Sequence, residues 1–376
     1  MKSIQMVDLV SQYEKIQSEV DQKVLEVIRS SQYINGPEVK SFAAELSEFL
    51  DVKHVIPCAN GTDALQLAMM ALGLKPGDEV ITASFTYVAT VEVIGLLGLT
   101  PVLVEVDPNT FNLDSEAFRK AITSKTKAVV PVHLYGQCAN MEEILAIAKA
   151  HDLAVIEDTA QAINGEYTFS DGTKKKAGCM GDIGTMSFFP SKNLGCYGDG
   201  GAIFTNNDEL AVTLRQMANH GQTVRYYHDN IGVNSRLDSL QAAILRIKLR
   251  YLNEYTAARQ ATAAFYDEAF KDEPKLDIPA RDTQSTHVFH QYTLKTNGVD
   301  RNEMHKYLAE HDVPSMIYYP VPVHKQKAYA NSRFDDTDFS STDDLCERVI
   351  SLPMQTELGE DQLNHIVSTV KEFLNK

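Results

Sequence analysis

The stretch that decides the fold lies in the middle of the chain and reads Gly184-Thr-Met-Ser187-Phe-Phe-Pro-Ser-Lys192-Asn-Leu-Gly-Cys-Tyr-Gly198-Asp199-Gly200-Gly201. Apolar runs at 184–189 and 201–205 predict two core strands that flank a loop containing Lys192 and several glycines. Most lysines are exposed. A lysine held between two core strands, in a loop too rich in glycine to shield itself, instead indicates a buried amine. Such an amine loses its proton easily and can act as a nucleophile.

Short apolar runs of the same kind occur further toward the N-terminus, at 80–82, 100–106, 128–133 and 154–157. Helical patterns at 63–72, 115–121 and 141–150 lie between them. This alternation predicts an α/β fold with a mostly parallel sheet and helices on both faces. In such sheets ligands bind beyond the carboxyl ends of the strands. Residues that follow each apolar run are therefore the candidate site residues.

The two ends of the chain show helical patterns. An amphipathic helix is predicted from Tyr13 to Ile28, and a second helix follows the Gly36-Pro37 pair. A long helical pattern at 238–270 predicts a bridge to a smaller lobe, which would contain a strand at 287–294 and a C-terminal helix. We therefore expect a large domain over 1–240, with the N-terminal helices, and a linking helix with a small C-terminal α/β domain over 241–376. The polar segment 168–176 predicts an exposed loop.

Composition limits the class of protein. The 376 residues are 44% apolar and carry a formal charge of −16, which indicates a globular chain and disfavours binding to nucleic acid or to an anionic membrane. No signal-peptide h-region and no run of about 20 apolar residues is present. The five cysteines are scattered without a C-x-x-C pair, as is typical of a reducing compartment. We expect a cytoplasmic protein.

Two further motifs follow apolar runs. In Cys58-Ala-Asn60-Gly61-Thr62-Asp63 the first N–H groups of a helix are free, which suits either an anion site or a plain N-cap. In Val155-Ile-Glu-Asp158-Thr-Ala-Gln161 the carboxylate of Asp158 stands at the edge of the sheet. It could hold a protonated ring nitrogen, bind a metal or cap a helix. Metal is the least favoured, because no His or Asp cluster with metal-ligand spacing accompanies it.

Taken together, the three motifs supply an anion cradle, an acid and a lysine, which are the groups that pyridoxal phosphate (PLP) requires. The glycine cluster after Lys192 is followed by a strand rather than a helix, so it is not a dinucleotide fingerprint. The phosphate-binding motif of P-loop NTPases is absent as well.

Over essentially its whole length the sequence resembles the DegT/DnrJ/EryC1/StrS family of sugar aminotransferases, which have the fold-type I, aspartate aminotransferase-like architecture. The motifs that carry the resemblance are Asn60-Gly-Thr-Asp-Ala-Leu65, Glu157-Asp-Thr-Ala-Gln161, Ser187-Phe-Phe-Pro-Ser-Lys192, Gly198-Asp-Gly-Gly201 and Gly232-Val-Asn-Ser-Arg-Leu-Asp238.

The resemblance implies roles for individual residues. Lys192 would bind PLP covalently and carry protons, and Asp158 would pair with the pyridinium nitrogen. Gln161 would lie by the ring hydroxyl, and Tyr87 would stack on the ring. The phosphate would be bound by Gly61, Thr62 and Ser187 of one subunit and by Asn234 of the neighbouring subunit, so that a homodimer is the active unit.

Finer likeness points to the branch that aminates UDP-2-acetamido-2-deoxy-3-oxo-glucuronate with L-glutamate, in bacterial surface-polysaccharide (lipopolysaccharide O-antigen) synthesis. Arg236 would grip a carboxylate, unless it pairs with Asp238. Tyr318 and Tyr319 would lie on the sugar side, where His324 is a weaker candidate. Tyr318 departs from the uronate branch, which has histidine there, because tyrosine brings no positive charge near pH 7.

Three other functions stay open at this point. One is an aminotransferase for a neutral 3- or 4-keto-6-deoxy nucleotide sugar. The second is a sugar dehydratase that uses pyridoxamine phosphate (PMP), which Lys192 disfavours because related dehydratases have histidine in its place. The third is a PLP-binding regulatory protein without turnover, which the acidic charge and the lack of a visible DNA-binding segment disfavour.

Overall fold

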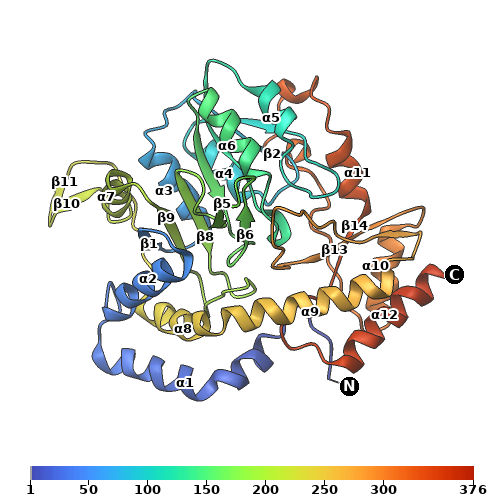
Figure 1. Ribbon diagram of the computed structural model, residues 1–376. Coiled ribbons are helices and arrows are strands. Elements are labelled where there is room, and N and C mark those ends of the chain that lie inside the picture. Colours follow the sequence, from blue (N-terminus) through green and yellow to red (C-terminus); the bar gives the residue numbers. More distant parts are fainter. Residues whose placement is uncertain (1) are drawn as a thin grey trace.

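The computed structural model describes residues 2–376, and its centre is a seven-stranded sheet (Figure 1). The strands lie in the order β1-β9-β8-β5-β4-β2-β3. Neighbours from β8 to β3 are parallel, whereas β9 is antiparallel to both β8 and β1. Their bounds are β1 His54–Cys58, β2 Glu79–Ala83, β3 Thr100–Val104, β4 Thr126–Val130, β5 Ala154–Asp158, β8 Ile183–Ser187 and β9 Gly201–Thr205. The predicted α/β fold with a mostly parallel sheet is confirmed.

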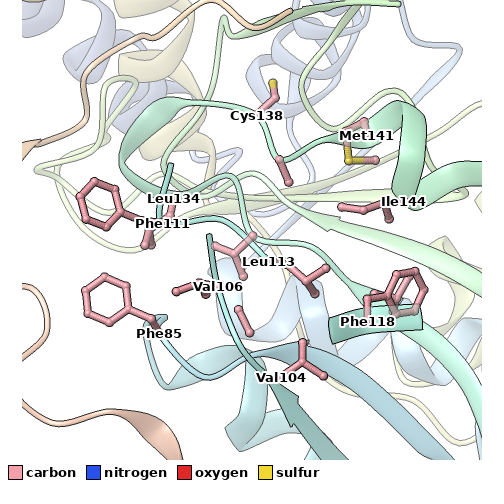
Figure 2. Close-up of a cluster of buried hydrophobic side chains, with 14 of the residues drawn as sticks. Phe85, Val104, Val106, Phe111, Leu113, Phe118, Leu134, Cys138, Met141 and Ile144 are labelled. Atoms are coloured by element: carbon pink, nitrogen blue, oxygen red, sulfur yellow. The ribbon is translucent and has the colours of Figure 1, made fainter. Parts of the chain in front are cut away.

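Helices cover both faces of this sheet because successive strand residues point to opposite faces. On one face α3 (Gly61–Ala71), α4 (Ala89–Leu96) and α7 (Asp208–Met217) pack on side chains such as Ile156 and Ile203. The other face is covered by α5 (Ser115–Ala121) and α6 (Met141–Ala150), and by α2 (Pro37–Leu50) and α8 (Ser239–Arg250). Figure 2 shows part of the α5–α6 side, where Phe85, Phe111 and Phe118 fill the space between strands and helices.

A second, three-stranded antiparallel sheet lies in the C-terminal part. It consists of β12 (Leu276–Asp277), β13 (Tyr292–Thr296) and β14 (Val349–Leu352), with α10 (Arg301–Glu310), α11 (Ser340–Arg348) and α12 (Glu360–Leu374). Its core also includes Ile4 from the N-terminal segment. Helix α1 (Leu9–Ser30) packs on α8. The predicted domain boundary between residues 240 and 241 stays a prediction.

Two sequence-based expectations need correction. The pattern at 238–270 is two helices, α8 and α9 (Leu252–Phe270), which meet at Tyr251, where φ is −97° and ψ is 0°. The Tyr251 hydroxyl donates to Glu19 on α1 at 2.6 Å. The segment 168–176, expected as an exposed loop, belongs to a hairpin formed by β6 (Glu166–Thr168) and β7 (Lys174–Lys176). It contains the last residue of β6, the turn and all of β7. Tyr167 is fully buried and fixes this hairpin to the core.

A second hairpin projects from the body. It is formed by β10 (Gln222–Val224) and β11 (Tyr227–His228), at the far left of Figure 1 beyond α7. Large apolar side chains near its tip are exposed, with Tyr226 at 75% and Tyr227 at 70%. None of the helices within residues 2–376 is both long and apolar enough to cross a membrane.

Candidate active site

One cavity of about 700 Å³ opens at the carboxyl ends of β5 and β8. All of the predicted site residues except Asn234 and Arg236 line it, namely Gly61, Thr62, Tyr87, Asp158, Gln161, Ser187, Lys192, Tyr318 and Tyr319. The sheet brings them together because parallel strands end at the same edge. The C-terminal part of the chain closes the cavity with its two tyrosines.

The N-terminus of α3 forms an anion cradle at one end of the cavity. Asn60 is the N-cap, and its Oδ1 accepts the N–H of Asp63 at 2.8 Å. The N–H groups of Gly61 and Thr62 have no partner inside the helix and are available to an anion. A Cβ at Gly61 would lie only 2.7 Å from the Cβ of Ser187, so glycine lets the Ser187 hydroxyl approach the helix terminus. The N-cap and the anion site are thus compatible.

Asp158 ends β5 and is only 7% exposed. One carboxylate oxygen accepts the hydroxyl of Thr90 at 2.8 Å, and the other accepts the N–H of Ala160 at 3.2 Å. These two bonds fix the orientation of the carboxylate in the cavity. A buried, oriented carboxylate can hold a protonated ring nitrogen.

The strand end is supported from behind by Glu157, whose carboxylate points away from the cavity. It accepts the N–H groups of Gly178, Met180 and Gly181 at 2.6–2.9 Å, and it contacts His133 Nε2 at 2.9 Å. Because His133 Nδ1 accepts the N–H of Ala139, the Nε2 carries the proton and donates to Glu157. His133 is therefore a structural residue.

Lys192 reaches into the cavity from the loop between β8 and β9. Burial of the amine lowers the pKa of Lys192 to about 8, although the charge of Asp158 acts in the opposite direction. Part of the side chain stays open to solvent at the cavity. A substantial neutral fraction near pH 7–8 makes this amine a competent nucleophile.

Aromatic residues form part of the cavity wall. The Gln161 amide is oriented by two contacts, since its Oε1 accepts the N–H of Tyr135 at 2.7 Å and its Nε2 donates to the Tyr319 hydroxyl at 3.2 Å. The hydroxyl of Tyr135 donates to the carbonyl of Tyr318. Tyr87 lies 6.2 Å from Tyr319 between ring centroids and is 57% exposed, so a flat ligand can lie against its ring.

Asn234 and Arg236 do not line the cavity of their own chain. Asn234 is exposed, and no ion pair of Arg236 occurs within residues 2–376, so the suggested pair with Asp238 is absent there. Ser235, between them, points inward, and its hydroxyl accepts the N–H of Ala59 at 3.0 Å. The segment is thus attached beside the anion cradle while Asn234 and Arg236 keep free polar groups.

His324 also lies outside the residues that line the cavity. Its Nδ1 is 2.7 Å from the Ser84 hydroxyl, and its ring stacks on Phe339 with centroids 4.0 Å apart. These contacts connect the end of β2 to the start of α11 and hold His324 between them.

His290 lines the cavity but was not predicted from the sequence as a site residue. It is 6% exposed, its Nδ1 has no hydrogen-bond partner within residues 2–376, and burial together with the charge of Lys192 holds its pKa well below the usual value. Its neighbour Phe289 has a φ of 48°, a left-handed conformation that turns the chain into the cavity. The strand pattern at 287–294 carries no signal for this turn.

The charges that line the cavity are mostly negative. Asp63, Asp158 and Asp199 face a single ammonium group, that of Lys192, and no arginine is among the lining residues. The cavity of one chain therefore offers little to neutralise an anionic substrate beyond the helix terminus.

Comparison with protein families gives one match. The model described as "DegT/DnrJ/EryC1/StrS aminotransferase family" covers residues 14–371. A Pseudomonas aeruginosa protein named UDP-2-acetamido-2-deoxy-3-oxo-D-glucuronate aminotransferase is 46% identical over 98% of this chain and 99% of its own length. A Geobacillus stearothermophilus protein named pleiotropic regulatory protein is 44% identical over 99% of this chain and 98% of its own.

Solved structures give the same picture. S. venezuelae DesV in complex with a ketimine intermediate superposes with a TM-score of 0.93, at 36% identity, over all of both chains. NtdA from Bacillus subtilis with bound cofactor PMP superposes with a TM-score of 0.89, at 30% identity, over 99% of this chain and 83% of the other.

Proposed function

Because the chain belongs to the DegT/DnrJ/EryC1/StrS aminotransferase family, we propose that it transfers an amino group from L-glutamate to carbon 3 of UDP-2-acetamido-2-deoxy-3-oxo-glucuronate. The enzyme class and the cofactor, PLP or PMP, follow from that membership and from its relatives. The observation that carries the proposal is the convergence of the cradle, Asp158 and Lys192 in one cavity. The 46% identity to the P. aeruginosa enzyme supports the choice of sugar.

The lining residues fit the cofactor by chemistry and by space. Gly61, Thr62 and Ser187 offer N–H and hydroxyl donors to a phosphate, and any side chain at Gly61 would fill their cradle. Tyr87 offers a ring face, and Asp158 offers an acceptor to a protonated ring nitrogen. When bound, PLP supplies an electron-withdrawing ring that stabilises the carbanion left by proton removal.

The protein's own residues then carry out positioning and proton transfer. Asp158, fixed by Thr90 and Ala160, keeps the ring nitrogen protonated. In the first half of the reaction the Lys192 amine, with its pKa lowered to about 8, takes a proton from the α carbon of the amino donor. In the second half the steps run in reverse order, and Lys192 donates a proton to carbon 3 of the sugar. Gln161 is held by Tyr135 and Tyr319 and keeps one side of the cavity in fixed geometry.

The site is composite in this proposal, with Asn234 and Arg236 supplied by a second subunit of a homodimer. Three observations support this. The cavity of one chain lacks an arginine, the side chains of Asn234 and Arg236 make no hydrogen bond or ion pair in their own chain within residues 2–376, and the hairpin at 222–228 exposes aromatic side chains. In the partner's cavity Arg236 would supply the missing charge for a carboxylate.

Mixed dimers test the composite site. Homodimers of Lys192→Ala and of Arg236→Ala should both be impaired. In a mixed dimer, one cavity would combine the intact Lys192 of one chain with the intact Arg236 of the other. Random mixing should therefore restore about a quarter of the wild-type activity, because half of the dimers are mixed and each has one intact site. If dimers shown to have exchanged subunits do not recover activity, Arg236 acts in the cavity of its own chain or in neither cavity.

The substrate is tested with purified protein, glutamate and a panel of keto sugar nucleotides, by following 2-oxoglutarate and the product mass. Amination of the 3-oxo-glucuronate derivative supports the proposal. Amination of a neutral 4-keto-6-deoxy sugar alone would refute the uronate assignment and leave the aminotransferase class intact.

We expect the enzyme in the cytoplasm of a bacterium, serving surface-polysaccharide (O-antigen) synthesis. The five cysteines, all free and buried, agree with a reducing compartment.

A neutral 3- or 4-keto-6-deoxy sugar is the second candidate, and Tyr318 is the observation that favours it. Burial raises the pKa of Tyr318, so its side chain is an uncharged hydrogen-bonding group at the cavity. Replacement of Tyr318 by His should improve kcat/KM for a uronate by roughly tenfold, and more so below pH 6.5, if a cation at this position recognises the carboxylate. A non-catalytic regulatory role is disfavoured by the presence of the amine that turnover needs.

A further inference from the structure

Lys248 on α8 is a second buried lysine, close in sequence to no catalytic motif. It is 1% exposed, and its Nζ donates to the carbonyl oxygen of Gly195 at 2.6 Å. The amine also lies 5.3 Å from the centroid of the Tyr197 ring. No carboxylate pairs with Lys248 within the part of the chain that is described. Burying a cation without a counter-charge costs free energy. We therefore expect the contact between the Lys248 amine and the Gly195 carbonyl to have a function.

Gly195 belongs to the same loop as Lys192, and the loop is compact. The N–H of Lys192 donates to the Phe189 carbonyl at 2.8 Å, and the N–H of Cys196 donates to the Phe188 carbonyl at 2.8 Å. A Cβ at Gly195 would lie 2.3 Å from the carbonyl oxygen of Pro190, so the two halves of the loop touch without intervening side chains. A shift of Gly195 must therefore displace the backbone from which the Lys192 side chain extends.

Other contacts hold the loop on either side of Gly195. Gln241, also on α8, makes two hydrogen bonds to the backbone of Tyr197. Its Oε1 accepts the N–H of Tyr197 at 2.8 Å, and its Nε2 donates to the Tyr197 carbonyl at 3.2 Å. The Asn193 amide donates to the Val288 carbonyl at 3.0 Å, in the segment that carries His290. Lys248 is the side-chain anchor nearest to Lys192 on the α8 side, and it does not itself line the cavity.

We propose that Lys248 is a positioning residue for Lys192: its amine, bound to the Gly195 carbonyl, fixes the loop that places the Lys192 amine near Asp158. This role rests on the proposed function of Lys192 as the reactive amine. It predicts that loss of the Lys248 amine affects the chemical step more than substrate binding, because the substrate contacts are left in place.

The test compares Lys248→Met with Lys295→Met. Lys295 serves as a control, since its Nζ also donates to a backbone carbonyl, that of Pro108 at 2.9 Å, and it does not line the cavity, although unlike Lys248 it lies 3.9 Å from a carboxylate, that of Asp277. Hydrogen exchange of peptides covering 188–198 in the protein without cofactor reports on the anchor itself. We expect at least tenfold faster exchange there in Lys248→Met, unchanged exchange in the other sheet strands, and wild-type exchange in Lys295→Met.

With cofactor, Lys248→Met should lower kcat about tenfold with little change in KM, and should shift the pH midpoint for the covalent link between Lys192 and PLP. Wild-type loop exchange together with a wild-type kcat overturns the proposal. If the wild-type protein shows no aminotransferase activity with any substrate while Lys248→Met still exchanges faster in the loop, the proposed function is refuted. The role of Lys248 in fixing the loop is then supported. Should Lys248→Met fail to fold, Lys248→Gln is measured in the same way, and wild-type loop exchange in it overturns the proposal.

Discussion

The cavity and the segment 234–236 lie next to each other in the chain's fold but differ in how their polar groups are satisfied. In the cavity Asp158 and Gln161 are each held by two hydrogen bonds. In the segment the Ser235 hydroxyl binds Ala59, whereas the side chains of Asn234 and Arg236 make no hydrogen bond or ion pair within residues 2–376, although the Asn234 backbone pairs with Asn219. Groups that one chain holds in place are ready for chemistry in that chain. Groups that are left free, beside an exposed aromatic hairpin, are suited to a second chain. The comparison predicts large effects on turnover from the cavity and effects on substrate binding from the segment.

The largest effect is expected for Lys192→Ala. Turnover should fall on the order of 10⁴-fold or more, because no other amine lines the cavity to take over proton transfer. PLP should no longer become covalently attached, as judged by borohydride reduction and mass spectrometry of the intact protein. The circular dichroism spectrum should be unchanged. If Lys192→Ala turns over at the wild-type rate, the cavity is not the catalytic site.

Asp158→Asn should come next, with a loss of about 10²- to 10³-fold in kcat. The amide keeps the shape of the carboxylate and can still accept from Thr90, but it no longer holds a proton on a ring nitrogen. Steady-state kinetics and PLP titration measure the two consequences separately. An equal loss in Thr90→Val would instead indicate that orientation of the group matters as much as its charge.

The pH dependence of PLP attachment gives a smaller effect. Only the neutral amine attacks an aldehyde, so the attachment rate should rise about tenfold per pH unit below pH 8 and level off above it, following the pKa of Lys192 at about 8. Asp158 raises this pKa by its charge, so the plateau should begin at lower pH in Asp158→Asn. Stopped-flow absorbance of the protein without cofactor measures both curves. A midpoint near the usual lysine value would mean that the amine is solvated.

The smallest effect sharpens the comparison from the side of the segment. Arg236→Ala should raise KM for the carboxylate-bearing substrate about 10- to 100-fold, the loss of one charge-assisted contact of about 1.5–3 kcal/mol. The melting temperature should stay within about 1 °C of wild type, since Arg236 makes no ion pair in its own chain within the described residues. A clear drop in melting temperature would mean that Arg236 supports its own fold instead.

The sequence by itself determined the alternation of strands and helices and the local motifs at the strand ends. Gly61, Asp158 and Lys192 each follow an apolar run, and parallel strands must end at one edge, so their convergence was predictable. Strand β1, at the edge of the sheet, was not predicted.

Only the tertiary structure decided which residues from distant segments complete and support the site. His290 enters the cavity because Phe289 has a left-handed backbone, and Lys248 reaches Gly195 because α8 packs across the loop after β8. Tyr135 acts through its backbone N–H on Gln161, which no side-chain pattern reveals. The physical reason is the same in each case. Local motifs depend on backbone geometry within a few residues, whereas these contacts join residues far apart in sequence and exist only once the layers are packed.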